Sequence, residues 1–506
     1  MENEKSSIQF EKDLLSGKHF YNKKLLINRP FQYKKNVLII GTGAGGKLVL
    51  KEIKSQKNYE IRGFVEDAPN LIGTEFEGIK IYGPISNFSK ILRSFNKRKI
   101  KIDQAIIAIP SAEGIKIKEI TKNIINKIPE VLILPTVYED PLSMKTGLPV
   151  PGRIRTVTIE DFFRRKPMLL PFEKISARYK DKNILVTGAG GSIGSELCKQ
   201  LLMFSPKKLI LLDSSEFSLY TIQTEISCLA RETKKEFVLA DLKNKERLEK
   251  VLSIHEPDII FHAAAYKHVP LLEDNPEEAI NNNLQSFCNL LSSIKNVKDF
   301  ILISTDKAVN PKNIMGISKR ICELIMKEKS EKSETNFFGV RFGNVAGSSG
   351  SVIPFFNSQI ERGGPITVTH PKMKRFFMTI PEAVQLVLQA PLLGNSGDLF
   401  ILEMGKQYSL LEIARDMIKL KGYIPNKDIQ IKITHVRKGE KLEEDLYEER
   451  EKTEETENPR IIRLETWRVD EKKLNSFLDK IFYLRKNLSG AKLKKILKEE
   501  FSKFAC

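Results

Sequence analysis

Two glycine-rich loops constrain the fold of this chain more than any other feature. Residues 36–40 (NVLII) lead into GTGAGG at 41–46, and residues 183–188 (NILVTG) lead into AGGSIG at 189–194. Glycines are needed where a chain turns tightly from a strand into a helix and its backbone approaches a phosphate at the helix N-terminus. Apolar runs that alternate with helical stretches follow both loops, which is typical of parallel sheets with crossover helices. The sequence therefore predicts an α/β fold with two Rossmann-type, doubly wound parallel sheets.

The predicted strands form two groups, one in each half of the chain. They lie at 36–40, 61–67, 104–110 and 130–135, and then at 183–188, 208–213, 236–241, 258–265, 299–305 and 337–345.

A length of 506 residues suggests two or three domains. We assign residues 1–35 to a polar N-terminal arm and 36–140 to an accessory Rossmann-like domain. Residues 141–178 form a connector that packs against one or both domains. Residues 179–506 form a catalytic domain with a mixed C-terminal substrate-binding part, in which the charged stretch at 443–460 is expected to be exposed.

The chain is basic, with 83 Lys and Arg residues, 64 Asp and Glu residues and a formal net charge of +19. The densest basic runs, at 97–102 and 484–495, have little aromatic interleaving, which argues against nucleic-acid binding. A lysine-rich composition bias explains the charge, and attraction for anionic metabolites or a membrane surface fits it as well.

The sequence lacks closely spaced cysteines, a signal peptide and membrane spans, and these features bear on its compartment and metal content. No two cysteines are close enough for zinc-type pairing, so no metal site is predicted and a reduced, cytoplasmic compartment is expected. The N-terminus lacks a signal-peptide core, and no run reaches the roughly 18 apolar residues of a membrane span. We expect a cytoplasmic protein, either free or bound peripherally at the inner face of the membrane. The cysteines are Cys198, Cys228, Cys288, Cys322 and Cys506.

The first glycine loop has two open interpretations. Gly41, Gly43 and Gly46 have the spacing of a dinucleotide-binding turn, and Glu66 and Asp67 end the next strand, where a carboxylate holds a ribose. The same loop also serves tight packing of a helix on a strand without any ligand.

The second loop predicts a dinucleotide site more strongly. Its glycines expose bare backbone at a helix N-terminus, where free N–H groups favour a pyrophosphate. Asp213 ends the next strand, and its carboxylate favours NAD over NADP, although the small polar side chains of Ser214 and Ser215 soften that preference. The predicted cofactor-binding residues are Gly188, Gly191, Ser192, Ile193, Gly194, Asp213, Ser214, Ser215, Asp241, Leu242, Ala263, Ala264, Ala265, Lys267, Ser304, Lys319 and Val345.

The stretch ILISTDKAVNPKNIMGISKR at 301–320 indicates the chemistry. Asp306 and Lys307 follow a strand at the carboxyl edge of the sheet, where open α/β folds place their active sites. Lys319 follows Met315 by four residues and shares its helix face. Ordinary reductases of this type carry Tyr-x-x-x-Lys here, and a thioether cannot exchange a proton. Another group must therefore deprotonate the substrate.

Five segments together resemble the UDP-N-acetylglucosamine 4,6-dehydratase family of bacterial polysaccharide and glycan biosynthesis. The resemblance is to its large, two-Rossmann members within the extended short-chain dehydrogenase/reductase superfamily. Large members usually begin with membrane spans, which this sequence lacks. The segments are TGAGGSIGSEL, HAAAYKHVPLLEDNP, STDKAVNPKNIMGISKR, RFGNVAGSSGSVIPFF and GEKL, and they span about 183 to 442.

The resemblance implies a UDP-sugar substrate and a tightly bound NAD that takes a hydride from C4 and returns it to C6. Lys307 would remove the C5 proton if its pKa is lowered by Lys319 or by burial, and Asp306 would protonate the departing C6 hydroxyl. Asp306 acting through a water would also replace the missing tyrosine at C4, and Thr305 would hydrogen-bond the sugar there. The implied catalytic residues are Thr305, Asp306, Lys307, Met315 and Lys319. The implied substrate-binding residues are Lys267, Asn344, Ser348, Ser351, Val352, Ile353, Arg375 and Glu440.

Several alternatives stay open at this stage. A nucleotide-sugar 4-epimerase shares the fold, the cofactor and C4 oxidation, although it needs no acid–base pair at C5 and C6. A non-catalytic nucleotide sensor is a rival from another class. His268 is either catalytic or a buried structural histidine. Met315 favours retention at C5, and analogy with the superfamily suggests a homo-oligomer.

Overall fold

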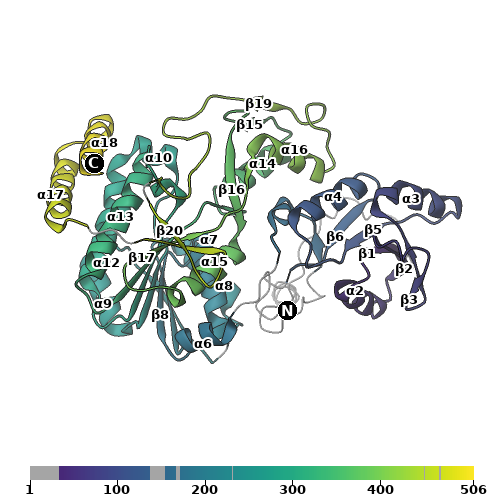
Figure 1. The fold of residues 1–506 in the computed structure, drawn as a ribbon, viewed down its shortest axis with the longest axis horizontal. Coiled ribbons are helices and arrows are strands. Elements are labelled where there is room, and N and C mark those ends of the chain that lie inside the picture. Colours follow the sequence, from purple (N-terminus) through teal and green to yellow (C-terminus); the bar gives the residue numbers. More distant parts are fainter. Residues whose placement is uncertain are drawn as a thin grey trace, which may run out of the picture.

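The computed structural model describes residues 34–136, 154–166, 171–230, 232–449, 451–465 and 469–505. The predicted arm at 1–35 lies outside them except for its last two residues. Residues 137–140 at the end of the predicted accessory domain and residues 141–153 and 167–170 of the predicted connector also lie outside them. Two α/β units, each built on its own sheet, lie at opposite ends of the molecule (Figure 1). The predicted fold class is confirmed: both units are Rossmann-type, doubly wound sheets.

The first sheet has the strand order β3-β4-β2-β1-β5-β6-β7. The five neighbouring strands β4, β2, β1, β5 and β6 are parallel, and the two short edge strands β3 and β7 run antiparallel to their neighbours. The central β1 (KNVLII) is buried after its first residue, as a strand covered by helices on both faces must be. The strands are β1 Lys35–Ile40, β2 Tyr59–Val65, β3 Glu75–Phe76, β4 Ile79–Tyr82, β5 Gln104–Ile107, β6 Glu130–Ile133 and β7 Arg155–Thr156, and the helices are α2 Ala44–Lys54, α3 Phe88–Lys97 and α4 Gly114–Ile124.

The second sheet has the order β10-β9-β8-β11-β12-β13-β17-β21-β20, with β10 to β17 parallel and the last two strands antiparallel. The strand order reverses between β8 and β11, and ligands of such sheets bind outside the carboxyl ends at that point. The strands are β8 Asn183–Thr187, β9 Lys208–Asp213, β10 Lys234–Leu239, β11 Ile259–His262, β12 Asp299–Ile303, β13 Asn336–Arg341, β17 Asp398–Leu402, β20 Thr453–Glu455 and β21 Ile461–Leu464. The helices around it are α6 Phe172–Tyr179, α7 Ser192–Leu201, α8 Glu216–Ile226, α9 Lys245–His255, α10 Val269–Asp274, α11 Pro276–Glu278, the π-helix η7 Ala279–Gln285, α12 Ser286–Ser293, α13 Ile314–Ser330 and α15 Ile380–Gln389.

A smaller lobe lies between the two units (Figure 1). One hydrophobic cluster joins this lobe to the first unit, and within it Phe163 of the 3-10 helix η5 (Ile159–Phe163) stacks on Phe377 with ring centroids 4.8 Å apart. The second half of the predicted connector therefore packs between both units. The lobe consists of β14 Asn344–Ala346, α14 Val352–Glu361, β15 Ile366–Val368, β16 Lys374–Thr379, β18 Gln407–Ser409, α16 Leu410–Leu420 and β19 Ile431–Ile433.

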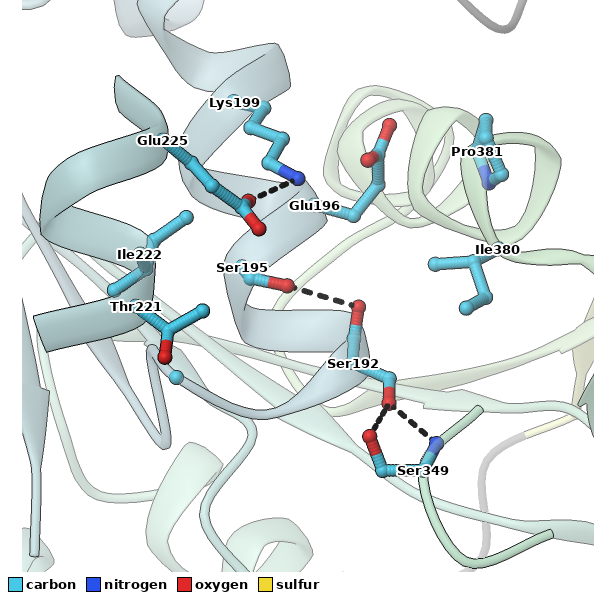
Figure 2. A pocket seen from close by; sticks show the side chains of 11 residues that line it. Ser192, Ser195, Glu196, Lys199, Thr221, Ile222, Glu225, Ser349, Ile380 and Pro381 are labelled. Carbon is cyan, nitrogen blue, oxygen red and sulfur yellow. Dashed lines mark hydrogen bonds and ion pairs between the residues drawn. The ribbon is translucent and has the colours of Figure 1, made fainter. Parts of the chain in front are cut away.

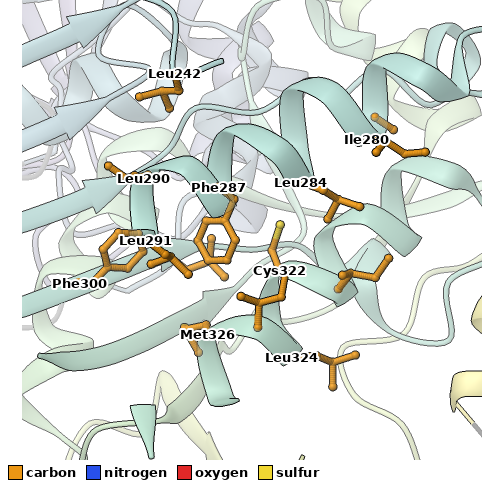
Figure 3. Packing of buried hydrophobic residues seen from close by; sticks show 14 of the residues in the cluster. Leu242, Ile280, Leu284, Phe287, Leu290, Leu291, Phe300, Cys322, Leu324 and Met326 are labelled. Atoms are coloured by element: carbon orange, nitrogen blue, oxygen red, sulfur yellow. The ribbon is translucent and has the colours of Figure 1, made fainter. Parts of the chain in front are cut away.

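A C-terminal helical hairpin covers one side of the second unit. Helices α17 (Glu471–Asn487) and α18 (Gly490–Ala505) pack against η7, α11 and α13. Their apolar residues join the large core between α12 and α13, in which Phe287, Leu290 and Met326 are buried (Figure 3). The hairpin therefore supports α13, the helix that carries Met315 and Lys319.

Two expectations from the sequence are wrong. The predicted strand at 337–345 is two strands in different sheets, β13 and β14, because the chain leaves the large sheet after Arg341 and enters the lobe. The charged stretch at 443–460 is not uniformly exposed, since Glu444, Glu448 and Glu451 are buried. Glu451 pairs with the interior guanidinium of Arg341, so its charge is compensated inside the protein.

Candidate active site

The predicted catalytic residues are held by a strand, a short turn and a helix that pack on one another. Thr305 follows β12 and caps the 3-10 turn η8 (Asp306–Ala308) through its hydroxyl. Asn313 caps α13 by accepting the N–H of Gly316 at 2.8 Å. A Cβ atom on Gly316 would lie 2.1 Å from the carbonyl oxygen of Lys307, so α13 rests directly on the backbone of η8, called the catalytic turn because it carries the predicted catalytic pair Asp306 and Lys307.

Asp306 and Lys307 form an ion pair in the interior. Nζ of Lys307 lies 2.9 Å from Oδ1 of Asp306 and 3.2 Å from Oδ1 of Asn344. The Thr305 hydroxyl donates to the same Asp306 oxygen at 2.9 Å. Asp306 is 1 % exposed, and its Oδ2 accepts no hydrogen bond from any described residue. A buried carboxylate oxygen without a partner among the described residues is uncommon in a folded protein.

The helix places Met315 and Lys319 on the next two turns, both buried at 4 % and 6 % exposure. Burial lowers the pKa of the Lys319 ammonium. His262, at the end of β11, is also buried, and burial together with the nearby Lys319 lowers its pKa to about 3. Its Nδ1 lies 2.9 Å from the hydroxyl of Thr187. His262 is therefore a neutral imidazole next to the charge of Lys319.

The expectation that the Lys307 pKa is lowered is wrong for the free protein. Burial acts to lower it, but the carboxylates of Asp306 and Glu444 outweigh burial and the pKa is raised. The resting state is therefore an ammonium held between two carboxylates.

Glu444 is the member of this cluster that the sequence did not reveal. It is 4 % exposed, and its Oε1 lies 3.8 Å from Nζ of Lys307 and 3.7 Å from Nε of Arg375. Burial raises the pKa of Glu444. Its place two residues after the GEKL segment is the one signal in the sequence that points toward it.

Arg375, expected at the substrate diphosphate, lies in β16 and is buried at 7 % exposure. Its Nη1 donates to the carbonyl oxygens of Lys374 and Leu442 at 2.7 and 3.1 Å. The same guanidinium thus holds the segment that carries Glu444.

The second glycine loop has the geometry of an anion-binding turn. Gly188 has φ +67°, and a Cβ on Gly194 would lie 2.0 Å from the carbonyl oxygen of Gly188. Gly191 is the N-cap of α7, whose first N–H groups have no partner within the helix, and a Cβ on Gly188 would lie 2.8 Å from Ala264, which follows β11. The Asp213 carboxylate accepts the N–H groups of Gly190 and Ser215 at 2.9 and 2.8 Å, which ties β9 to the loop.

A cavity of about 360 Å³ adjoins this loop between α7, α8 and the start of α15 (Figure 2). Ser192 lies at its edge, and its hydroxyl accepts the N–H of Ser349 at 3.0 Å. Lys199 and Glu225 form an ion pair of 2.6 Å across it. The loop at 347–351 therefore contacts the N-terminus of α7, whose N–H groups are predicted to bind the pyrophosphate.

Most of the remaining predicted residues lie in loops that follow strands of the second sheet, or in the lobe. Ala263, Ala264 and Ala265 follow β11, and Lys267 lies exposed beyond them. The His268 ring touches Gly350 of the loop at 347–351. Further residues with described positions are Ser214 after β9, Asp241 after β10 in an ion pair with Lys243, the buried Leu242, Ser304, Val345 and Ser348, and the part-buried Ile193, Ser351 and Val352.

Two predicted substrate residues lie away from the Lys307 ammonium. Ile353 is buried in the hydrophobic cluster that joins the lobe to the first unit. Glu440 closes its own turn, accepting the N–H of Arg437 at 3.3 Å. Neither side chain forms a described contact with Asp306 or Lys307.

In the first glycine loop, Glu66 is hydrogen-bonded within the protein, whereas Gly43, the N-cap of α2, makes no side-chain cap hydrogen bond. The Glu66 carboxylate accepts the N–H and the hydroxyl of Thr42 at 3.0 and 2.9 Å with one oxygen. Its other oxygen accepts the N–H of Asp67 at 2.8 Å. The pKa of Glu66 is lowered because these hydrogen bonds outweigh burial. A Cβ on Gly46 would lie 2.2 Å from the carbonyl oxygen of Gly41, the same close packing that Gly194 shows against Gly188 in the second loop, so this contact fits both interpretations of the first loop.

Within the described ranges, no helix is both long and apolar enough to cross a membrane. In the same part of the chain, no group of three or more His, Cys, Asp or Glu residues is arranged to hold a metal ion.

Comparisons with known proteins match both units. A family model described as polysaccharide biosynthesis protein matches residues 184–466, and one described as CoA binding domain matches residues 32–133. The capsular polysaccharide biosynthesis protein CapD of Staphylococcus aureus is 42% identical over 426 residues, which cover 83% of this chain and 69% of that protein. A UDP-glucose 4-epimerase of Rickettsia rickettsii is 35% identical over 277 residues, 53% of this chain and 78% of that protein.

Among solved structures, the X-ray structure of Pen from Bacillus thuringiensis has a TM-score of 0.52 and 32% identity, and the match covers 57% of this chain and 90% of that one. The Asp306–Lys307 pair and the second glycine loop both lie inside the range of the first family model.

Proposed function

The chain belongs to the polysaccharide biosynthesis protein family of the extended short-chain dehydrogenase/reductase superfamily, and we propose that it is a nucleotide-sugar 4,6-dehydratase. Its substrate would be UDP-N-acetylglucosamine and its product a UDP-4-keto-6-deoxy sugar. The observation that carries the proposal is the buried Asp306–Lys307 pair, with Oδ2 of Asp306 free of described partners. Elimination across C5 and C6 needs both a base and an acid, and this pair supplies one of each.

The residues of the second glycine loop fit a dinucleotide. Bare backbone at Gly188, Gly191 and Gly194 leaves room for a pyrophosphate against the N-terminus of α7, where a side chain at Gly194 would collide with the loop. Asp213 keeps lone pairs for ribose hydroxyls, which favours a tightly bound NAD over NADP. NAD held there would take a hydride from C4 and return it to C6.

The protein groups then divide the proton chemistry. Asp306 accepts the O4 proton directly or through a water and delivers it to the C6 hydroxyl, which leaves as water. Lys307 removes the C5 proton, which the 4-keto group has made acidic, and its ammonium, whose protons exchange with solvent, protonates C5 again at the same position. Arg375 would engage the diphosphate through its guanidinium, and Thr305 would hydrogen-bond the sugar near C4.

An epimerase is the second candidate, because the similar Rickettsia rickettsii protein is named a UDP-glucose 4-epimerase. Epimerisation leaves the C6 hydroxymethyl group intact and uses no base at C5. A buried ammonium paired to a carboxylate would then have no part in the reaction.

Proton NMR of the purified protein with UDP-N-acetylglucosamine in deuterated water separates the two reactions. We expect a new C6 methyl signal, a 4-keto or hydrated product, and deuterium at C5. Lys307→Ala should abolish the methyl signal while the cofactor stays bound, and Lys312→Ala, at an exposed lysine nearby, should leave it unchanged. An intact C6 hydroxymethyl in a UDP-N-acetylgalactosamine product would contradict dehydration and establish the epimerase.

A further inference from the structure

The cluster around Lys307 contains a second buried carboxylate that the dehydration steps leave without a role. Glu444 faces Lys307 from a segment far along the chain. Backbone contacts fix that segment: the N–H of Lys374 donates to the carbonyl oxygen of Leu442 at 2.9 Å, and the Gln407 amide donates to the carbonyl oxygen of Glu444 at 3.0 Å. Hydrogen bonds thus fix the backbone at Leu442 and at Glu444. A charged side chain buried in a fixed position needs a compensating partner or a functional role.

Counting protons shows that one more acceptor is needed. Asp306 must begin as a carboxylate, because it receives the O4 proton and passes it to the C6 oxygen. Lys307 must begin the C5 step as a neutral amine. In the free protein, however, Lys307 is an ammonium, because Asp306 and Glu444 outweigh the effect of burial on its pKa. The Lys307 proton must therefore move to a group other than Asp306.

We propose that Glu444 accepts the proton of Lys307 when substrate binds and holds it through the reaction, as a positioning residue for the base. This inference rests on the proposed dehydration. An N–H bond of the Lys307 ammonium breaks and an O–H bond forms on Glu444, so an ammonium and a carboxylate become an amine and a carboxylic acid. No electrons are transferred, and the amine is then free to take the C5 proton and return it.

Substrate would trigger the transfer by excluding water from the cluster. The charges that face Glu444 are those of Lys307, Arg375 and Lys441, which favour its carboxylate form, and that of Asp306, which opposes it. A sugar that covers the cluster removes the water that stabilises separated charges, and this favours a neutral pair over a buried ion pair.

The separation of 3.8 Å between Oε1 of Glu444 and Nζ of Lys307 is longer than a hydrogen bond. Catalytic contacts are often longer in a free enzyme than in its substrate complex, and a small side-chain rotation or one water closes this gap. Asn344, the other described partner of the ammonium, offers an amide oxygen that is not a base.

The dependence of kcat on pH tests the proposal. In wild-type enzyme, protonation of Lys307 should not lower kcat near neutral pH, because the Lys307 proton moves to Glu444 when substrate binds. Glu444→Gln preserves shape but cannot take the proton, so its kcat should fall about 100-fold at pH 7 and recover as the pH rises. Glu443→Gln, at the neighbouring glutamate that is 53% exposed and pairs with Lys374, is the matched control and should behave as wild type.

A Glu444→Gln variant with wild-type kcat, or with the same loss at every pH, would overturn the proposal. A second measurement compares wild type with the same variant. UDP-4-deoxy-N-acetylglucosamine lacks the O4 proton, so binding it to wild-type enzyme should give a protonated-carboxyl band in the infrared difference spectrum, and loss of that band in Glu444→Gln assigns it to Glu444 rather than to Asp306. Absence of that band overturns the proposal as well. Failure of the dehydration itself would appear separately, as wild-type enzyme that forms no C6 methyl product.

Discussion

Arg341 and Glu323 form a two-bond ion pair in the interior of the catalytic unit. Nε and Nη2 of Arg341 each lie 2.8 Å from an oxygen of Glu323, and both side chains are 1 % exposed. The Ser304 hydroxyl donates to Glu323 at 2.5 Å, and Arg341 also pairs with Glu451 at 2.8 Å. The network therefore joins the end of β12, immediately before the catalytic turn, to the acidic segment near the C-terminus.

This network predicts a specific acid sensitivity. Burial acts to raise the pKa of Glu323, but Arg341 outweighs it and lowers the pKa from 4.5 to about 2. Because the folded-state pKa is depressed, the stabilisation is complete above about pH 4.5 and is lost as the pH falls toward 2. The shift corresponds to roughly 3 kcal/mol. Thermal unfolding between pH 6 and pH 3 should show a steeper fall of Tm in wild type than in Glu323→Gln. Equal slopes would mean that Glu323 does not titrate with unfolding.

Replacing Gly316 by alanine should damage the catalytic turn from the helix side. The added methyl would lie 2.1 Å from the Lys307 carbonyl oxygen, so α13 must move away from the turn. We expect about 1–3 kcal/mol of destabilisation and about a 100-fold lower kcat, because the ammonium is displaced from the sugar. Gly43→Ala is the control, since a Cβ there meets nothing within 4 Å and φ is −68°. Wild-type kcat in Gly316→Ala would refute this role of the helix packing.

The C-terminal hairpin should stabilise the start of α13 through Glu273. This buried carboxylate accepts the N–H of Ile314 at 2.8 Å and pairs with Lys494 and Lys498 of α18 at 2.7 and 3.2 Å. Replacing both lysines by methionine leaves Glu273 buried without its cations, so Tm should fall by several degrees. Differential scanning calorimetry measures this loss. Lys495→Met, at a lysine 79% exposed on the same helix, is the comparison and should melt as wild type. An unchanged Tm in the double variant would show that the pairing contributes nothing to stability.

Short sequence patterns by themselves determined the fold class of this protein and part of its candidate site. A glycine loop after an apolar strand, repeated in the two halves, specifies two Rossmann-type sheets, because the strand–turn–helix geometry is decided within about twenty residues. The same holds for Asp306 and Lys307 at the end of β12 and for Met315 and Lys319 on one face of α13. Each of these arrangements depends on spacing that can be read directly from the sequence.

The tertiary structure alone decided which distant groups share the site and with what charge. Arg375 and Glu444 reach Lys307 only because β16 and the segment at 442–444 pack together. An acidic stretch is expected to be exposed unless the cations that pair with it are known. Glu451 pairs with Arg341 and Glu444 with Lys307, and both buried cations lie more than 100 residues earlier in the sequence. The Lys307 pKa likewise depends on a balance of burial and two carboxylates that no local pattern encodes. Electrostatic energies follow distances in space, and spacing along the chain sets those distances only within a single strand, turn or helix.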